Sequence, residues 1–333
     1  MLERLPCLPC DNVLPTPWSN TFAKNSFEYA PNHPSKSHEF KAPSPIMSNL
    51  EASNLFSVKD LVVVITGGGT GIGLMMAKAL DANGAKVYVI GRRKEPLEAA
   101  AKQAKNQNIH PLVGDITSQS SLSSLASEIS SQNPYINVLI ANAGTSGPRF
   151  PPLAPQPPLA QYVASLWETP PADFTETFAV NTTAAFYTLL AFLPLLDAGN
   201  KSGKFDQKSQ FIATASIGAY NRRPLSSYAY GPSKAATVHM VKQIATMFAP
   251  YQIRANVIAP GLYPSEMTSD IFAENDGWEE GSMPPEQIPA KRAGREEDMA
   301  GVVLFLCSKA GAYLDGNVVV SDGGRLGVVP STY

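Results

Sequence analysis

Hydrophobic and polar positions alternate in a regular way from residue 60 onward. Short runs rich in β-branched residues, such as Leu61–Thr66 and Lys86–Ile90, are separated by longer amphipathic stretches, such as Ile72–Asn83 and Glu95–Lys105. Short apolar runs predict strands buried on both faces, and stretches with helical spacing between them predict crossover helices. Further strands are expected at Val138–Ala141, Phe211–Thr214, Arg254–Ile258 and Val318–Val320.

This alternation predicts an α/β fold: a single Rossmann-type, doubly wound parallel sheet with helices on both faces. One domain is expected over residues 55–329, with the cofactor and substrate sites in that same domain. Proline is concentrated in two segments, because residues 1–50 and residues 148–171 each hold eight of the 29 prolines. The second segment therefore reads as an insertion within the domain.

Residues 1–54 are predicted to be a disordered N-terminal extension, since they carry Ser, Asn and Pro without sustained periodicity. They contain no continuous apolar core of a secretion signal, and their four basic residues fit a mitochondrial presequence poorly. Met47 stands just before the ordered pattern. Whether residues 1–46 belong to the mature protein is therefore left open, with Met47 as the alternative start.

Composition excludes several classes of partner. The 26 Lys and Arg against 28 Asp and Glu give a net charge of −2, so no electrostatic attraction favours nucleic acid or an anionic membrane. The longest apolar stretch, Ala184–Leu196, is shorter than the roughly 18 residues that span a bilayer and predicts a buried helix. Cys7, Cys10 and Cys307 are too few for a disulfide framework, which indicates the cytoplasm. The four histidines have no ligand spacing, so no metal is expected.

The first predicted strand leads directly into a glycine-rich loop. Its glycines follow the spacing G-x-x-x-G-x-G at Gly67, Gly71 and Gly73, with Thr70 and Ile72 between them, and an apolar helical pattern follows. A strand, a glycine-rich turn and a helix start together predict a phosphate site, because backbone N–H groups and the helix N-terminus favour an anion. A merely tight turn is the alternative.

The second predicted strand ends at Arg92 and Arg93, where a dinucleotide-binding protein usually carries an acid for the ribose. Two guanidinium groups suit a 2′-phosphate, which they can hold with paired hydrogen bonds. The sequence therefore predicts NADP(H) rather than NAD(H). The alternative is that both arginines are solvated surface charges.

Tyr230 and Lys234 are four residues apart, so a helix places both on one face. An ammonium group beside a phenol lowers the phenol pKa from about 10, which makes the tyrosine a usable acid or base near neutral pH. Ser216, after a predicted strand, is suited to hold a substrate carbonyl oxygen. The neighbouring Tyr228 has Pro232 at its fourth position, so the lysine spacing selects Tyr230.

The ordered set of motifs resembles the short-chain dehydrogenase/reductase superfamily over residues 55–326. The motifs are the 66–73 loop, Asp115 after a strand, Asn142-Ala143-Gly144, Asn181, Ser216, the Tyr230 and Lys234 pair, Pro260-Gly261 and Asp322-Gly323-Gly324. Each motif alone is modest evidence, whereas the set in this order is highly specific.

This resemblance implies roles for the catalytic residues. Tyr230 would give the proton to the carbonyl, Ser216 would orient the substrate oxygen, and Lys234 would bind the nicotinamide ribose and lower the tyrosine pKa. Asn181 would hold a water of the family's proton relay. The alternative for Asn181 is that it satisfies backbone groups at a helix kink.

The resemblance also implies cofactor contacts. Asp115 would meet the adenine edge, Asn142 and Gly144 would line the adenosine ribose, and Ile258 with Ser265 would flank the nicotinamide. The alternative for Asp115 is a turn or cap residue. Thr268 is the alternative to Ser265, which its spacing after Pro-Gly favours.

Two segments bear on the substrate. The proline-rich insertion 146–171 carries Phe150, Tyr162 and Trp167, and it is interpreted either as a wall of the substrate pocket or as a surface excursion or subunit contact. Residues 263–288, with Met267, Phe272, Trp278 and Met283, resemble the family's mobile lid.

The chain is thus expected to be an NADPH-dependent reductase of ketones, or in reverse an alcohol dehydrogenase, on a small carbonyl or alcohol substrate. Residues 262–268 and the insertion resemble a β-ketoacyl reductase-like branch found in secondary metabolism. The alternatives are a non-catalytic NADP(H) sensor, or an isomerase or dehydratase of the same superfamily. Two apolar helices resemble the family's subunit interface, so a homodimer or homotetramer is expected.

Overall fold

A computed structural model describes residues 49–149, 157–224, 227–269 and 279–333 of the chain. Residues Asn49–Tyr333 form one compact unit, which begins six residues before the predicted domain and ends four residues after it. Cys7, Cys10, the Met47 start and residues 1–48 of the predicted extension lie outside the described residues. The short helix α1 (Ala52–Leu55) overlaps the last three residues of the segment that the sequence assigned to the extension.

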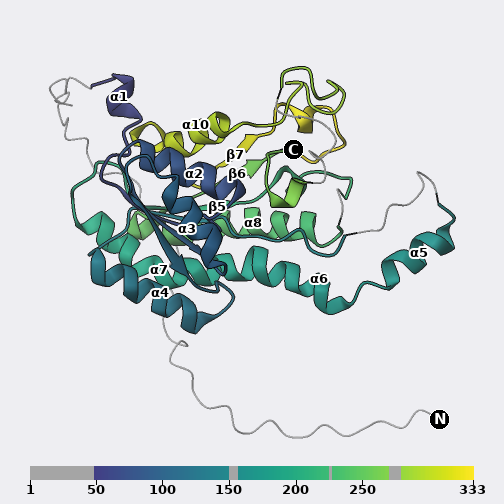
Figure 1. Cartoon of the computed structure of the whole chain (residues 1–333), viewed down its shortest axis with the longest axis horizontal. Helices are drawn as coiled ribbons and strands as arrows, with labels where there is room; N and C mark the ends of the chain where they lie inside the picture. Colours follow the sequence, from purple (N-terminus) through teal and green to yellow (C-terminus); the bar gives the residue numbers. More distant parts are fainter. Residues whose placement is uncertain (1–48, 150–156, 225–226, 270–278) are drawn as a thin grey trace, which may run out of the picture. The chain divides into compact units, whose positions relative to one another are not determined.

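A parallel sheet forms the centre of this unit (Figure 1), and its strands follow the order β3-β2-β1-β4-β5-β6-β7. Its strands are β1 (Val62–Thr66), β2 (Lys86–Gly91), β3 (Ile109–Val113), β4 (Val138–Ala141), β5 (Gln210–Thr214), β6 (Arg254–Pro260) and β7 (Val318–Ser321). Six of them lie at predicted runs. The exception is β3, an edge strand that contains His110 and Pro111 and is only partly buried, so its sequence shows no continuous apolar run.

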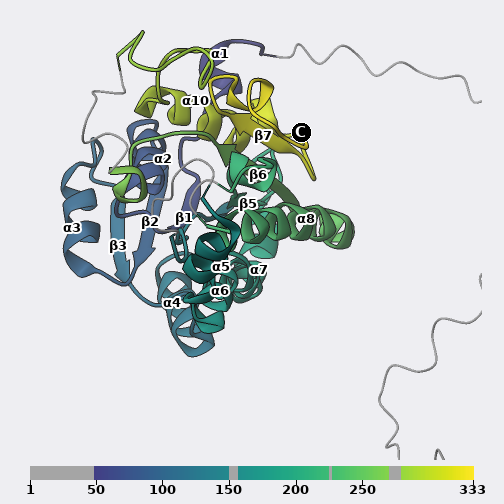
Figure 2. The same ribbon diagram turned by 90° about the vertical axis from the view of Figure 1, so that its right-hand side faces the viewer.

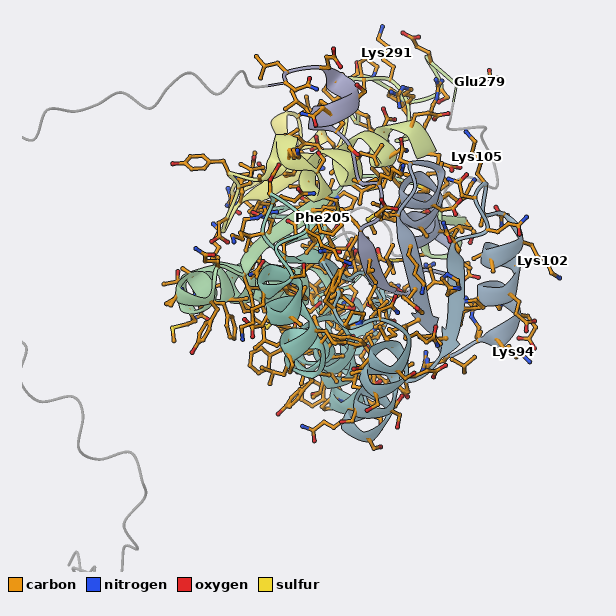
Figure 3. The ribbon with its side chains drawn as sticks, turned by 90° about the vertical axis from the view of Figure 1, so that its left-hand side faces the viewer. Lys94, Lys102, Lys105, Phe205, Glu279 and Lys291 are labelled. Carbon is orange, nitrogen blue, oxygen red and sulfur yellow. The ribbon has the colours of Figure 1, made fainter. Side chains whose placement is uncertain are left out.

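Helices cover both faces of the sheet, as the alternating pattern predicts (Figure 2). On one face lie α2 (Gly71–Ala82), α3 (Lys94–Lys102) and α10 (Glu296–Cys307), and on the other lie α4 (Gln119–Gln132), α7 (Ala184–Lys201) and α8 (Tyr230–Phe248). Each layer has its own buried apolar cluster against the sheet. On the outer surface of α3, Lys94 and Lys102 point away from the sheet (Figure 3).

The helix beneath the sheet is longer than the apolar run Ala184–Leu196 suggested. It joins α6 (Pro171–Phe178), a π turn (Ala179–Thr183) and α7 into 31 residues, whose best window has a mean hydropathy of 1.5. Length and composition would therefore allow it to cross a membrane, which corrects the argument from the run alone. Leu189, Phe192 and Leu196 of this helix are fully buried in the core, so in this fold its apolar face packs on the sheet.

The register of the strands brings the predicted motifs together at one edge of the sheet. Thr66 of β1 pairs with Ile90 of β2 and Ala141 of β4, and Thr214 of β5 pairs with Ile258 of β6. The chain segments that follow these strands therefore emerge side by side at the carboxyl edge, where parallel α/β sheets bind ligands.

Candidate active site

One cavity of about 360 Å³ lies at this carboxyl edge. It is lined by the predicted residues Gly67, Thr70, Gly71, Ile72, Arg92, Arg93, Asp115, Asn142, Gly144, Ser216, Tyr230, Lys234 and Ser265, and by others including Thr214, Glu266 and Met267. The lining comes from segments up to two hundred residues apart in the chain. The fold thus gathers most of the predicted site residues around a single space.

The glycine-rich loop has a conformation that requires glycine at several positions. Gly67 and Gly71 have φ values of 65° and 53°, in the region that side chains disfavour. A Cβ atom on Gly73 would lie 2.2 Å from the carbonyl oxygen of Gly67. Gly73 therefore lets the start of α2 approach the turn, although it is not among the described residues that line the cavity.

Asn142, directly after β4, forms hydrogen bonds with this loop. Its side-chain Nδ2 donates to the carbonyl oxygens of Thr66, at 3.1 Å, and Gly67, at 3.2 Å. The hydroxyl of Thr66 in turn accepts hydrogen bonds from the backbone N–H groups of Asn142 and Ala143. Asn142 thus holds the glycine loop in place and lines the cavity, and Thr66 is a positioning residue that the sequence analysis did not identify.

The catalytic candidates meet where the chain leaves β5 and enters α8. Tyr230 begins α8. Its phenol shares a hydrogen bond with Ser216, which lies two residues after the end of β5. The ammonium of Lys234, one turn along α8, lies 5.9 Å from the centre of the Tyr230 ring and donates to the carbonyl oxygen of Thr214 at 2.8 Å. The structure therefore brings Tyr230, and not Tyr228, to Ser216 and Lys234.

Burial controls the protonation of this group. It raises the pKa of Tyr230, and the hydrogen bond with Ser216 lowers that pKa only in part. Burial also lowers the pKa of the Lys234 ammonium to about 8. The lowered phenol pKa expected from the Tyr230 and Lys234 pair is thus wrong for the protein alone, because desolvation disfavours the phenolate more than nearby groups stabilise it.

Asn181 lies in the π turn, fully within the helix beneath the sheet. Its Oδ1 accepts from the backbone N–H of Thr145, and its Nδ2 donates to the carbonyl oxygen of Thr145 and to the hydroxyl of Ser233. A Cβ atom on Gly144 would lie 3.0 Å from this Oδ1 and 3.2 Å from the ammonium of Lys234. Asn181 therefore satisfies backbone groups, as the alternative reading proposed, at a π turn of the kind often found at functional sites.

Asp115 lines the cavity and also stabilises a local turn. Its Oδ1 accepts from the backbone N–H of Thr117 at 2.9 Å and from the Thr117 hydroxyl at 2.7 Å. These hydrogen bonds, and to a smaller extent the nearby Arg92, lower the pKa of the Asp115 carboxyl. The turn alternative for Asp115 is thus present in the structure together with its place on the cavity.

Arg92 and Arg93 directly follow the end of β2, and both line the cavity. The guanidinium of Arg93 lies 2.6 Å from the carboxylate of Glu266, on the single turn η4 (Glu266–Thr268). Glu266 was not among the predicted site residues, because 173 positions separate it from Arg93 and no local pattern links the two. Arg92 and Arg93 are both exposed, so the alternative of solvated charges stays open, and Arg93 has Glu266 as an ion-pair partner at the cavity.

Ser265, which the spacing favours, and its alternative Thr268 both line the cavity. Ser265 lines the cavity, and a Cβ atom on Gly71 would lie 2.9 Å from its Cβ. Thr268 also lines the cavity, but its hydroxyl donates to the carbonyl oxygen of Tyr263 at 2.7 Å. Ile258 is fully buried in a core cluster and is not among the residues that line the cavity in the described part of the chain.

The proline-rich insertion contains a helix, α5 (Leu159–Trp167), that the sequence analysis did not predict. The Tyr162 hydroxyl lies 2.7 Å from that of Tyr228, whereas the Trp167 side chain is 86% exposed. Neither aromatic residue of α5 lines the cavity. Of the predicted lid residues, Met267 lines the cavity and Met283 does not, whereas Phe272 and Trp278 lie outside the described residues. Phe150 of the insertion also lies outside them.

Within the described ranges, no group of three His, Cys, Asp or Glu side chains is placed to hold a metal ion. The cavity instead has the features that a dinucleotide requires: a glycine loop at a helix N-terminus, two arginines where β2 ends, and a cluster of hydroxyl and ammonium groups opposite them. The residues present therefore fit a nicotinamide dinucleotide.

Comparisons with known proteins agree with this arrangement. A family model described as enoyl-(acyl carrier protein) reductase matches residues 67–325. The short-chain dehydrogenase/reductase PhomF of Diaporthe leptostromiformis is 52% identical over 291 residues, which are 87% of this chain and 99% of that relative. The rhamnolipids biosynthesis 3-oxoacyl-(acyl-carrier-protein) reductase of Pseudomonas aeruginosa is 31% identical and aligns with 81% of this chain and 97% of its own length.

Solved structures show the same fold. The Pseudomonas aeruginosa RhlG/NADP active-site complex matches with a TM-score of 0.68 and 29% identity, over 81% of this chain and 98% of that chain. Levodione reductase matches with a TM-score of 0.66 and 26% identity, over 80% and 98% of the two chains. The sheet described above thus has counterparts in levodione reductase and in a protein solved as a complex with NADP.

Proposed function

The chain belongs to the short-chain dehydrogenase/reductase family of oxidoreductases, which bind a nicotinamide cofactor, and we propose that it reduces a ketone with NADPH or oxidises the matching secondary alcohol. One observation carries this proposal. Ser216, Tyr230 and Lys234 line the cavity beyond β5, and Arg92 and Arg93 line it after β2, with β1 and β4 between these two strands. When bound, the nicotinamide supplies or accepts the hydride.

The residues of the chain supply the proton and hold the substrate. Ser216 donates a hydrogen bond to the substrate oxygen, and the Tyr230 phenol gives that oxygen its proton as negative charge develops there. The Lys234 ammonium stabilises the negative charge that remains on the Tyr230 phenolate, and Asn181 positions the neighbouring Thr145 backbone. In the oxidative direction the same phenolate removes the alcohol proton.

The preference for NADP(H) is supported by the end of β2. Arg92 and Arg93 follow this strand, and both line the cavity. Guanidinium groups match a phosphate with charge-assisted, paired hydrogen bonds, whereas the ribose hydroxyls of NAD(H) need an acceptor. The likeness to a relative whose solved complex contains NADP supports the same preference.

A 3-oxoacyl group or a related ketone of secondary metabolism is the substrate class we propose. The name of the Pseudomonas relative, a 3-oxoacyl reductase of rhamnolipids biosynthesis, supports this class, as do the resemblances of residues 262–268. We propose a cytoplasmic location, which subcellular fractionation would check. The proposed assembly is a homodimer or homotetramer. Exposed apolar side chains on α7 and α8, such as Leu190 and Met247, support subunit contacts there.

The first test measures NADPH and NADH consumption with 3-oxoacyl thioesters, aromatic ketones and cyclic diketones. Tyr230→Phe is expected to lower kcat at least about a hundredfold, because the proton donor is lost, and to leave the dissociation constant of NADPH unchanged. Tyr228→Phe is the matched control, since it removes the same hydroxyl from an exposed tyrosine two positions earlier. Unchanged turnover in Tyr230→Phe would contradict the proposed role.

The cofactor part has a separate test. Arg92→Ala is expected to raise the Michaelis constant for NADPH about tenfold while that for NADH changes little, because only NADPH carries the 2′-phosphate. Equal changes for both cofactors would contradict the assignment of this end of the cavity to the phosphate.

A further inference from the structure

An acidic side chain occupies the place where the proposed phosphate would bind. The carboxylate of Glu266 lies 2.6 Å from the guanidinium of Arg93, and both residues line the cavity. The side chains of Arg93 and Glu266 are 60% and 59% exposed, so an anion from solution can reach Arg93 and replace the Glu266 carboxylate. An exposed ion pair of this kind is weak, and a dianionic phosphate is a stronger partner for arginine than a carboxylate.

The turn that carries Glu266 is held from two other directions. Ser265, directly before it, lies against Gly71 of the glycine loop. The carbonyl oxygen of Met267, directly after it, accepts a hydrogen bond of 2.9 Å from Arg149 in the segment that follows β4. η4 thus contacts Arg93 through Glu266 and Arg149 through Met267. Arg149 belongs to the segment that leads into the insertion.

We propose that Glu266 is a specificity-determining residue that competes with the cofactor's 2′-phosphate for Arg93. NADP(H) displaces the carboxylate, because Glu266 occupies the Nη2 group of Arg93 that a phosphate held by paired hydrogen bonds needs, and this frees η4 from its contact with Arg93. NAD(H) has no group that replaces the carboxylate and leaves the ion pair intact. This inference rests on the proposed use of NADP(H), and it adds a competitor that neither the family resemblance nor the comparisons assign.

The experiment measures dissociation constants by fluorescence titration of the full chain with NADPH and NADH, and by calorimetry with adenosine 2′,5′-bisphosphate and adenosine 5′-monophosphate. Glu266→Gln is expected to tighten NADPH and the bisphosphate about threefold, a change of the size of an exposed ion pair. Affinity for NADH and the monophosphate is expected to change less than about 1.5-fold, since these ligands do not displace Glu266.

Two further variants separate the explanations. Glu286→Gln removes the same charge from an exposed position that does not line the cavity, and it is expected to change no affinity. In the Arg93→Ala background, Glu266→Gln is expected to have no effect on NADPH, because the contested guanidinium is gone.

The outcomes distinguish this inference from the proposed function. If Arg93→Ala weakens NADPH but Glu266→Gln leaves it unchanged or weaker, the competition is overturned and the NADP(H) site stands. If Glu266→Gln tightens NADPH and NADH alike, or also acts without Arg93, a general charge effect replaces the competition. If Arg93→Ala does not weaken NADPH, the phosphate site and the competition both fail.

Discussion

At the scale of single residues, burial decides the chemistry of the proposed catalytic group. Lys234 is 4% exposed, and the carbonyl oxygen of Thr214 is the acceptor 2.8 Å from its ammonium. Burial also disfavours the charged form of Tyr230 and raises its pKa above the ordinary value. The protein therefore holds a neutral phenol beside a cation that is costly to bury. A substrate or cofactor that interacts with these groups changes that balance.

The cost of burying Lys234 predicts a stability change. Lys234→Met is expected to abolish turnover and to raise the free energy of unfolding at pH 7 by about 2 kcal/mol, after allowance for the lost hydrogen bond. The pKa of Lys234 is about 8 in the folded protein against 10.5 ordinarily, so the wild type carries the full cost below pH 8. That cost disappears as the pH rises from 8 to 10.5, so the advantage of the variant is expected to shrink.

Urea unfolding of both proteins without cofactor, at pH 7, 8.5 and 10, measures this difference. Lys242→Met is the control, because Lys242 is an exposed lysine on the same helix and its loss is expected to change stability little at any of these pH values. A Lys234→Met variant less stable than the wild type at pH 7 would show that the hydrogen bond to Thr214 outweighs the cost of burial.

At the scale of elements, the cavity depends on how closely strands and helices approach one another. β1 and α2 meet across the glycine loop, where the carbonyl oxygen of Gly67 and the amide of Asn142 occupy the space beside Gly73. The long helix beneath the sheet changes from α6 to α7 through a π turn that contains Asn181. Both junctions place backbone groups at the edge of the cavity, so small changes in them are expected to affect the site.

Gly73→Ala tests the first junction. Its Cβ would lie 2.2 Å from the oxygen of Gly67 and 2.5 Å from Nδ2 of Asn142, so the loop or α2 must shift. We expect a loss of about 2 kcal/mol in unfolding free energy and at least about tenfold weaker NADPH binding. Chemical unfolding and fluorescence titration measure the two effects.

Gly301→Ala provides the matched control in another helix. Gly301 is exposed on α10, and a Cβ there would meet no heavy atom of the described residues within 4 Å. Alanine has the better helix propensity, so this variant is expected to gain about 0.5–1 kcal/mol and to bind NADPH normally. If both substitutions had the same small effect, the close approach at Gly73 would not be a structural requirement.

At the scale of the whole molecule, both ends of the compact unit contribute contacts. Near its start, Asn54 contacts Lys309, which also pairs with Asp206. Near its end, the ring of Tyr333 packs against Tyr220 with centroids 5.0 Å apart, next to the segment that follows Ser216. The unit therefore continues beyond the predicted residue 329, and its last residues cover the segment that carries a catalytic candidate.

A variant that lacks residues 1–48 tests whether this unit is sufficient. We expect its thermal midpoint to stay within about 2 °C of the full chain, because the two buried clusters lie within residues 49–333. Light scattering is expected to give the mass of a dimer or tetramer for both proteins. An aggregated or unfolded product would show that the first 48 residues are required, and a monomeric one would contradict the proposed assembly.

Local sequence patterns determined much of the fold and of the candidate site. Six strands, the glycine loop and the shared face of Tyr230 and Lys234 were predictable, because periodicity and short spacings act over a few residues. The chain order of these motifs also identified the family. Edge strand β3 and helix α5 were not predicted, since neither presents a continuous buried apolar run.

Only the tertiary structure decided which distant groups meet. It placed Glu266 against Arg93, put Ile258 in the core instead of on the cavity, and set α5 beside Tyr228 through Tyr162. It also reversed the expected direction of the Tyr230 pKa, because that pKa depends on burial as well as on the lysine four positions away. Contacts between remote segments and the exclusion of water arise only when the chain has folded, so no local pattern encodes them.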